Sequence, residues 1–489
     1  MSKKNKIQKK PARPGSEPSA FAPKKTETIA KKPSKFLVIL KPHIAFAILA
    51  FIFGTGFLLT TPPFQVADEI AHFDRAFKLS EFGTFQKNVD NKSGDYVPSN
   101  IDSTFMLFRY ISWDYDKKTD KQKISAAMKI PLQQNKRSFT NIDAGPYFYF
   151  SYIPQYPAIY IGKILGLSVL SILYLGRFFG LLFYILCVGY AIKIIPIAKY
   201  LLMTLALMPM CLAQAGSYNA DCVLFSFSFL AVALLLKLSF ERKQITVNKE
   251  IVLLFFILLI IGTLKFIYLP IALLIFLLPK VNFKNNIRYF VTTISLVLVS
   301  AIFTIAWFKA NPTTLSLSDT TTDAAQKLQS LIHNPFLSFK IVKSTWDYVG
   351  DIHYYQAIGI LGYLDTRLPQ IVYSVFGLLI LFFTLFESNK IFKFTIWQRV
   401  ILIVASVPVF FMIFDSLYLV NPKQNGFVAT GIQGRYFIPV IFPVLLAFQG
   451  LIPLRLNLSK YKIAVGLLVV ILFIVLLSSQ LAVIDRYFE

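Results

Sequence analysis

Two adjacent carboxylates follow the first long apolar run of the chain, and a histidine stands one helical turn beyond them. Asp68 and Glu69 come after a Thr-Pro-Pro sequence and open a long charged segment. A carboxylate at a membrane surface can accept a proton as a general base, with Asp68 the first candidate and Glu69 the alternate. His72 could orient that acid, relay a proton, or join Asp68 and Glu69 as ligands of a divalent cation such as Mg²⁺ or Mn²⁺.

The same segment predicts an amphipathic helix that lies on the membrane. At about 100° per residue, Asp68, His72 and Arg75 share one face and the apolar side chains share the opposite one. We expect the charged face to point outward. A simpler interpretation is that Asp68 caps this helix and that Arg75 pairs with a carboxylate.

Three cations stand at the ends of other apolar runs, where they would share one membrane level. Arg177 lies early in the second run, Lys265 lies between the fifth and the sixth, and Arg435 opens the tenth. Such a group can bind a phosphate, and Arg75 of the first loop could contribute to it. Each cation could instead snorkel or pair between helices.

Acidic, amide and phenol groups accompany these cations. Asp221 begins the fourth run, where an ionised carboxylate is costly without a partner. Tyrosines near the second loop could bind a ligand, or they could instead anchor the protein at the membrane–water interface. The other candidate substrate-binding residues are Tyr218, Asn219, Asp221, Tyr268, Asp365 and Tyr436.

The elements that position these residues are membrane spans. Of 489 residues, 55% are hydrophobic and 15% charged, with a mean hydropathy of +0.59, which indicates an all-α integral membrane protein. We expect about eleven spans, within a range of about ten to thirteen, because runs of roughly 20 apolar residues cross a bilayer as helices. The expected spans are 43–60, 171–192, 200–214, 218–237, 250–264, 266–279, 288–308, 370–386, 398–417, 434–452 and 462–481.

The segment 147–166 is a twelfth apolar candidate, interrupted by two prolines and a lysine and rich in tyrosine. We interpret it as an interfacial or re-entrant helix. With eleven spans and a cytoplasmic N-terminus, the basic clusters of the short loops all fall in the cytoplasm, as the positive-inside rule requires. Counting 147–166 as a span would move every one of them outside.

This path places two long loops, 61–146 and 309–369, on the exterior of the cytoplasmic membrane, where we expect short interfacial helices. Both loops are nearly neutral, so the net charge of +25 reports topology and does not indicate nucleic-acid binding. Residues 1–35 form a basic tail with almost no large apolar side chains to bury, which we expect to be disordered and cytoplasmic. The polytopic domain covers 36–489.

Five short motifs together resemble a bacterial polytopic membrane family known only as a domain of unknown function (DUF 2142 type), which is grouped with the GT-C glycosyltransferases. The resemblance runs from about residue 40 to about residue 480, and the order of the motifs makes the set specific. The family often has proline where this chain has Ala67 and Ile70, and an aromatic residue at Asp74. The motifs are Thr61-Pro62-Pro63-Phe64-Gln65-Val66 with Asp68-Glu69, Ala71-His72-Phe73 and Arg75-Ala76; Ser217-Tyr218-Asn219-Ala220-Asp221; Lys265 with Tyr268-Leu269-Pro270; Leu361-Gly362-Tyr363-Leu364-Asp365-Thr366; and Gly434-Arg435-Tyr436-Phe437 with Pro439.

The resemblance implies a GT-C-like fold and an enzyme that transfers a sugar from a polyprenyl-phosphate carrier, usually with inversion, to an acceptor on the outer side of the membrane. An envelope glycan or a glycolipid would be the acceptor. In that chemistry Asp68, or Glu69, would take the proton of the attacking hydroxyl. Arg435, Lys265, Arg177 or Arg75 would stabilise the departing phosphate, alone or together with a divalent cation.

Two other classes remain open from the sequence. A carrier or flippase for lipid-linked sugars would use the same cations without chemistry, although the chain has no internal repeat of the kind common in transporters. A non-catalytic scaffold for envelope assembly would not need the Asp68-Glu69 pair. The sugar, the acceptor and any metal dependence are not encoded in a readable pattern.

Overall fold

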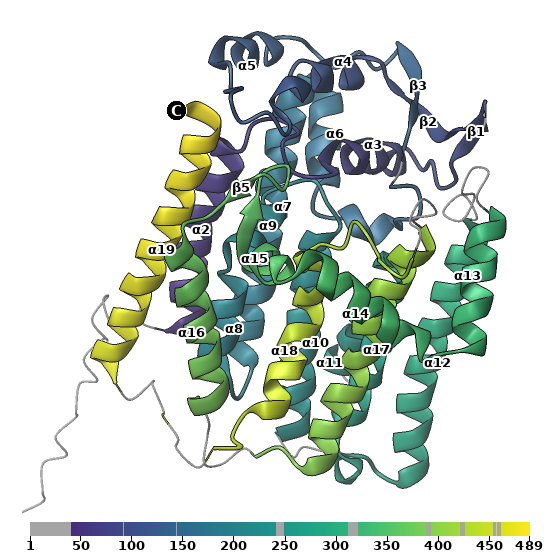
Figure 1. The fold of residues 1–489 in the computed structure, drawn as a ribbon, viewed down its shortest axis with the longest axis vertical. Coiled ribbons are helices and arrows are strands. Elements are labelled where there is room, and N and C mark those ends of the chain that lie inside the picture. Colours follow the sequence, from purple (N-terminus) through teal and green to yellow (C-terminus); the bar gives the residue numbers. More distant parts are fainter. Residues whose placement is uncertain are drawn as a thin grey trace, which may run out of the picture.

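The structure is a computed structural model, and it describes residues 41–90, 92–142, 144–240, 249–311, 321–387, 393–420, 426–452, 456 and 461–489. The predicted disordered tail, 1–35, lies outside these residues. Within them the chain is mostly helical, with a helical bundle and a smaller layer of short helices and strands at one end of it (Figure 1). We call this layer, built from the described residues of 61–168 and 321–369, the polar layer.

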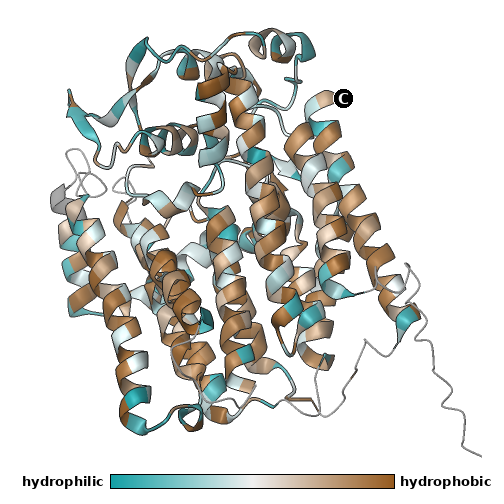
Figure 2. Cartoon of the chain, turned by 180° about the vertical axis from the view of Figure 1, so that it is seen from behind, coloured by the Kyte–Doolittle hydropathy of each residue, from teal (hydrophilic) through white to brown (hydrophobic). Residues whose placement is uncertain are grey.

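Six helices of the described chain are long and apolar enough to cross a membrane. Their outward faces are apolar as well as their buried ones, as expected of helices surrounded by lipid (Figure 2). The chain is therefore a multi-pass membrane protein. The six helices are α2 (Pro42–Thr60), α7 (Val169–Ile194), α10 (Asp221–Phe240), α12 (Asn286–Ala310), α17 (Ile396–Val420) and α19 (Lys462–Phe488).

Shorter helices fill the space between the six. The predicted run 200–214 is broken at Pro209, because proline cannot continue the preceding helix. The run 266–279 is a 3₁₀ helix that contains Pro270. These shorter elements are α8 (Lys199–Ala206), α9 (Pro209–Ala215), α11 (Lys249–Leu264), η3 (Phe266–Leu277), η4 (Lys280–Asn282), α16 (Gln370–Phe386), η6 (Gly434–Phe437) and α18 (Ile438–Phe448).

The two long segments between spans lie at the same end of the bundle, where α2 ends and α10 begins (Figure 1). The predicted interfacial helix is present as α6 (Tyr156–Leu165), whose ten residues rise only about 15 Å, too little to cross a bilayer. The remaining helices of this end are α3 (Glu69–Ser80), α4 (Asn100–Met106), η1 (Arg109–Ile111), α5 (Lys121–Ala127), η2 (Tyr149–Tyr152), α13 (Thr321–His333), α14 (Leu337–Val349) and α15 (Ile352–Gly359).

A small antiparallel sheet covers α3 on this side. Strands β1 (Lys87–Val89), β2 (Lys92–Pro98) and β3 (Arg137–Asn141) lie in that order, with Tyr96 opposite Phe139. An ion-pair cluster holds the end of α3 to this sheet and to α6, because Glu81 contacts both Arg137 (2.6 Å) and Lys163 (2.9 Å). These two cations hold the pKa of Glu81 at about 2, against the effect of its partial burial.

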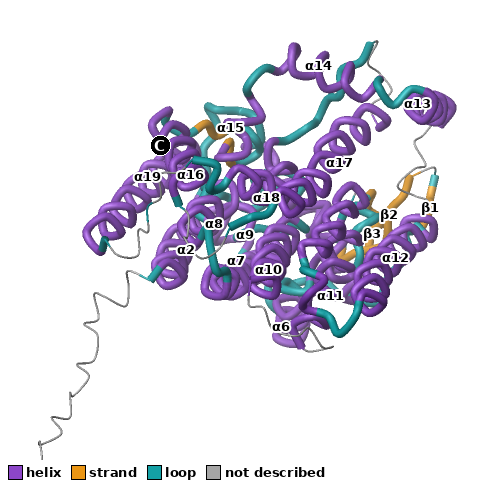
Figure 3. The backbone as a smooth tube through the Cα atoms, turned by 90° about the horizontal axis from the view of Figure 1, so that it is seen from below, coloured by secondary structure: helices purple, strands orange, loops and turns teal. Residues whose placement is uncertain are grey.

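A second, two-stranded pairing lies in the other long segment. Strands β4 (Ile360–Leu361) and β5 (Thr366–Arg367) pair antiparallel around a tight turn. Seen along the bundle, the spanning helices surround the central α10 and α18 (Figure 3). Both α10 and η6 begin beside the start of α3, because Arg435 of η6 contacts Asp68 and also Asp221, the first residue of α10.

Candidate active site

Asp68 is the exposed carboxylate of the predicted pair. It precedes α3 in a left-handed conformation (φ +65°), which is strained for a residue with a side chain, and its side chain makes no capping bond. Asp68 thus occupies the N-cap position and its carbonyl accepts the His72 N–H, but its side chain does not cap the helix as the simpler interpretation expects. Its side chain is 56% exposed, and its Oδ2 atom lies 3.2 Å from Nη2 of Arg435.

Arg435 and Asp221, both buried, form one charge cluster with the half-buried Lys265 beside Asp68. Asp221 at the start of α10 contacts Arg435 Nε at 3.2 Å through one oxygen and Lys265 Nζ at 3.0 Å through the other. The structure thus brings together residues that the sequence had placed at one level, and it supplies the partner that Asp221 needs. The Nη1 atom of Arg435 is buried and has no hydrogen-bond acceptor among the described residues.

A cavity of about 420 Å³ opens next to this cluster. At one end it is lined by Lys265, Tyr147 and Tyr436, and the Lys265 ammonium lies 4.6 Å from the centre of the Tyr436 ring. Apart from Ser416, the rest of its wall is apolar. These wall residues include Phe266 and Ile267 of η3, Phe308 of α12, and Ile413, Leu417 and Val420 of α17. The cavity therefore combines a cationic, aromatic end with an apolar interior between helices.

Glu69 belongs to a different, fully buried site. Arg177 donates to both of its carboxylate oxygens, at 2.8 Å from Nε and 2.5 Å from Nη2, and the backbone N–H of Tyr218 donates to Oε1 at 3.1 Å. The other Arg177 N–H groups bind the carbonyls of Leu58, Thr61 and Pro62. Neither side chain is exposed, so the predictions of Glu69 as alternate base and of Arg177 as phosphate ligand have no support in this geometry.

Arg75 is also buried, with its guanidinium bound to backbone carbonyls. It donates to the carbonyls of Tyr147, Gly83 and Thr84. The predicted outward charged face of this helix is therefore wrong. Residues 147–152 and the loop residues Gly83 and Thr84 cover the face that carries His72 and Arg75, and Arg75 joins these loop segments and does not line the cavity.

His72 contacts tyrosines of this covering segment. Its Nδ1 atom lies 2.6 Å from the Tyr152 hydroxyl, and its ring packs edge-on against Tyr147 at 4.9 Å. Burial lowers the pKa of His72 to about 4, which outweighs the nearby charges of Asp68 and Asp221, so the imidazole is neutral at pH 7. His72 thus holds Tyr147, a residue of the cavity wall.

Three of the predicted binding residues have structural roles. Tyr218 is buried against Phe73, with ring centres 4.8 Å apart. Asn219 accepts the Cys222 N–H at 2.9 Å and so begins α10. Tyr268 donates to the carbonyl of Tyr436 at 2.9 Å, which fixes the backbone beside Arg435.

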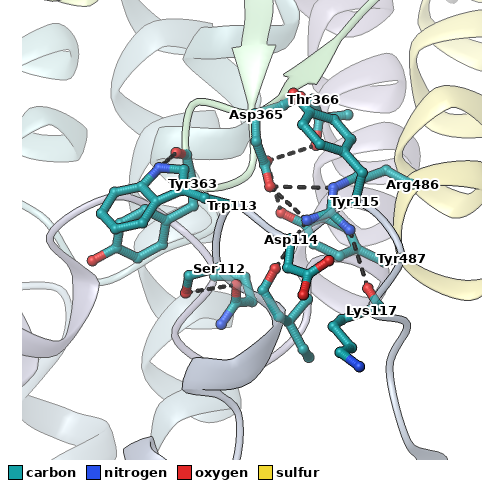
Figure 4. A network of polar contacts seen from close by, with 12 residues as sticks. Ser112, Trp113, Asp114, Tyr115, Lys117, Tyr363, Asp365, Thr366, Arg486 and Tyr487 are labelled. Carbon is teal, nitrogen blue, oxygen red and sulfur yellow. Dashed lines mark hydrogen bonds and ion pairs between the residues drawn. The ribbon is translucent and has the colours of Figure 1, made fainter.

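Asp365 lies in a separate network that joins the two long segments to α19 (Figure 4). Its Oδ2 atom accepts from Arg486 at 2.7 Å, and its backbone carbonyl accepts from the Tyr115 hydroxyl at 2.6 Å. Arg486 also donates to the carbonyl of Lys117 at 3.2 Å. Asp365 therefore fixes the polar layer and is not a ligand of the cavity.

Next to this network, Trp113 and Tyr363 form an aromatic pair (Figure 4). Their ring centres are 4.7 Å apart, and the indole N–H of Trp113 donates to the Tyr363 carbonyl at 3.0 Å. Trp113 is 69% exposed and has a strained φ of +60°. Burial raises the pKa of the Tyr363 phenol, and the negative charge of Asp68 raises it further.

The predicted metal ligands do not form a metal site. In the part of the chain that the structure describes, no three His, Cys, Asp or Glu side chains are grouped to hold an ion. Both oxygens of Glu69 are bound by Arg177, and Nδ1 of His72 contacts Tyr152. The set Asp68, Glu69 and His72 therefore does not fit a divalent cation.

Sequence reasoning missed Tyr147, Tyr152, Trp113 and Arg486 as residues of the site or its support. Tyr147 and Tyr152 were noted only as members of a tyrosine-rich segment. Arg486 stands near the end of the last apolar run, a place typical of a snorkelling residue, and Trp113 stands alone in a polar loop. Their roles depend on contacts between segments distant in the sequence.

The fold and the site define a polytopic helical membrane protein with a buried charge cluster under a polar layer. Residues 51–446 match the family model described as "Predicted membrane protein (DUF2142)", so the chain belongs to that family. No curated protein and no solved structure matches the chain.

Proposed function

We propose that this protein is a membrane glycosyltransferase that moves a sugar from a polyprenyl-phosphate carrier to a cell-envelope acceptor, with Asp68 as general base. One observation carries the proposal. An exposed carboxylate, Asp68, lies 3.2 Å from the buried Arg435, and Arg435 shares Asp221 with Lys265, which lines a cavity with mostly apolar helix walls. A polyprenyl-phosphate sugar needs all three of these environments: a carboxylate base for the transfer reaction, cations for the phosphate, and an apolar wall for the isoprenoid chain.

In the proposed reaction the acceptor hydroxyl attacks the anomeric carbon while Asp68 takes its proton. The bond between the anomeric carbon and the phosphate oxygen breaks, and the polyprenyl phosphate leaves with the additional negative charge. Lys265 and the unpaired Nη1 of Arg435 would stabilise that charge. The isoprenoid chain would lie in the apolar part of the cavity, against α12 and α17.

The charge balance of the cluster supports this division of roles. Two carboxylates, Asp68 and Asp221, accompany two cations, Lys265 and Arg435, and burial keeps His72 neutral. The cluster is therefore neutral before the reaction and gains one positive charge when Asp68 is protonated. The cluster therefore becomes positive at the same time as the leaving phosphate becomes more negative, and the two charges attract each other.

The proposal includes the finer topology that the sequence suggests. Eleven spans, a cytoplasmic N-terminus and a GT-C-like arrangement would place the polar layer and Asp68 on the exterior of the cytoplasmic membrane. There the Trp113–Tyr363 pair would contact an acceptor sugar, since the electron-rich face of an aromatic ring attracts the polarised C–H groups of a pyranose. The envelope acceptor would approach from this side.

A panel of radiolabelled polyprenyl-phosphate sugars, supplied with membrane-extracted acceptors to purified protein, tests the proposal. We expect transfer by the wild type and loss of transfer in Asp68→Asn, with donor binding retained. The carrier is the second candidate, since Lys265 and Arg435 would guide a phosphate head group without chemistry. If wild type and Asp68→Asn translocate lipid-linked sugar equally and neither transfers it, the proposal of a glycosyltransferase is wrong and the carrier function is supported.

A further inference from the structure

A second cavity lies at the opposite end of the bundle from Asp68. It is a groove of about 610 Å³ between α2 and α7, within the range of about 300–1,000 Å³ typical of small-ligand sites. Its walls are almost entirely apolar and include Ala47, Phe51 and Leu186. The 19 residues of α2 rise about 28 Å between its two ends, so this groove and Asp68 lie at opposite faces of the membrane.

Basic side chains surround the open end of the groove. His43 and Lys193 belong to its lining, Lys41 directly precedes α2 two residues before His43, and Lys199 Nζ donates to the Lys193 carbonyl at 3.0 Å. Glu387 acts on Lys199. No carboxylate pairs with Lys41 or Lys193 among the residues that the structure describes, so these two cations carry uncompensated charge.

Gly189 keeps the groove open. A Cβ atom added at this position of α7 would meet only the Phe46 ring, at 3.9 Å. A glycine within a helix lowers helix stability by roughly 1 kcal/mol relative to alanine. The open space beside Phe46 is therefore a feature that a larger side chain would fill.

We propose that this groove is a binding site for an anionic phospholipid of the leaflet opposite the Asp68 site. Its phosphate would contact Lys41, Lys193 and the His43 imidazole, and one acyl chain would lie along the apolar wall of α2 and α7. Charge complementarity decides the occupant, because a neutral lipid would leave the lysines uncompensated. The site does not depend on the proposed transfer reaction.

The test measures lipid retention by native mass spectrometry of the full chain in detergent. Phosphatidylglycerol and phosphatidylcholine with identical acyl chains are the probes, and glycerol 3-phosphate represents the head group alone. We expect preferential retention of phosphatidylglycerol. Each lysine contributes about fivefold, so Lys41→Gln with Lys193→Gln lowers retention about 25-fold.

Gly189→Leu tests the acyl-chain part of the groove without changing any charged residue. It should reduce phosphatidylglycerol retention several-fold, whereas Gly466→Leu in α19, which meets no neighbour within 4 Å, should not. The exposed residues Lys284 and Arg288, replaced together by glutamine, control for loss of charge alone.

Three results would overturn the proposal. Equal retention of the two lipids would mean ordinary solvation by lipid, and equal binding of glycerol 3-phosphate would mean an anion site without a lipid. A dimer that dissociates in Gly189→Leu would mean that a second copy covers the groove.

Discussion

Arg435 joins two carboxylates that have different surroundings. Its Nη2 atom lies 3.2 Å from Asp68, which is largely exposed, and its Nε atom lies 3.2 Å from Asp221, which is buried. Asp68 and Arg435 are 367 residues apart in the sequence. The arginine therefore places the start of η6 against the start of α3 and joins the exposed carboxylate to the charge cluster whose Lys265 lines the cavity.

The buried pair Glu69–Arg177 should matter for stability and not for chemistry. Glu69→Gln leaves a buried guanidinium without its counterion, which typically costs about 3–5 kcal/mol. We expect a lower unfolding temperature and a lower yield in detergent, whereas Asp68→Asn keeps the wild-type unfolding temperature. A stable Glu69→Gln protein that has lost only activity would contradict this assignment.

Lys265 should act on the lipid-phosphate donor. Lys265→Met removes a charge-assisted contact worth about 1.5–3 kcal/mol, so the KM for the donor should rise roughly 10- to 100-fold. The exposed Lys129, replaced by methionine, is the matched control. An unchanged donor KM, measured at saturating acceptor, would remove Lys265 from the site.

Trp113 should act on the acceptor. Trp113→Ala removes the exposed ring of the aromatic pair, so the acceptor KM should rise about tenfold while donor binding stays constant. Trp346→Ala, at another exposed tryptophan of the polar layer, is the comparison. A rise in donor KM with an unchanged acceptor KM would contradict the role given to Trp113.

His72 should make the folded state sensitive to acid. Its folded pKa of about 4 lies below the ordinary value of 6.5, so the unfolded chain binds one more proton between these pH values. The contribution of His72 to stability is full above about pH 6.5 and is lost as the pH falls toward about 4. Within this window the slope approaches 1.4 kcal/mol per pH unit.

Thermal unfolding between pH 7 and pH 4.5 measures this contribution as the difference between wild type and His72→Gln. The difference removes the titration of other groups, including Asp74, whose pKa is raised by burial and then by Asp102 and which acts in the opposite direction. His333→Gln, at an exposed histidine, is the control. Parallel profiles for wild type and His72→Gln would show that His72 does not titrate in this way.

The apolar runs predicted the long helices well because span length and hydropathy are local properties of the chain. The predicted run 43–60 became α2, and 370–386 became α16 with the same bounds. Asp221 and Lys265 meet because both stand where a run begins or ends at one membrane level. Such positions can be inferred before any contact is known.

The division between Asp68 and Glu69 could not be predicted in the same way. Asp68 and Glu69 are adjacent and both acidic, so the sequence gives no reason to assign them different roles. They differ in their tertiary partners, because Glu69 binds Arg177, which is 108 residues away in the sequence. The left-handed turn at Asp68 also rotates its side chain out of the helical face that periodicity assigns to it. His72 and Arg75 were predicted to be exposed because the segment that covers them, residues 147–152, is distant in the sequence.

The most direct test compares Asp68→Asn with Asp116→Asn, an exposed acid of the same segment, at matched folding and with donor binding measured in the same preparation. If Asp68 is the general base, transfer from the polyprenyl-phosphate sugar falls about 10²- to 10⁴-fold in Asp68→Asn, while donor affinity and the Asp116→Asn rate stay at wild-type values. Transfer at the wild-type rate in Asp68→Asn would contradict the central claim.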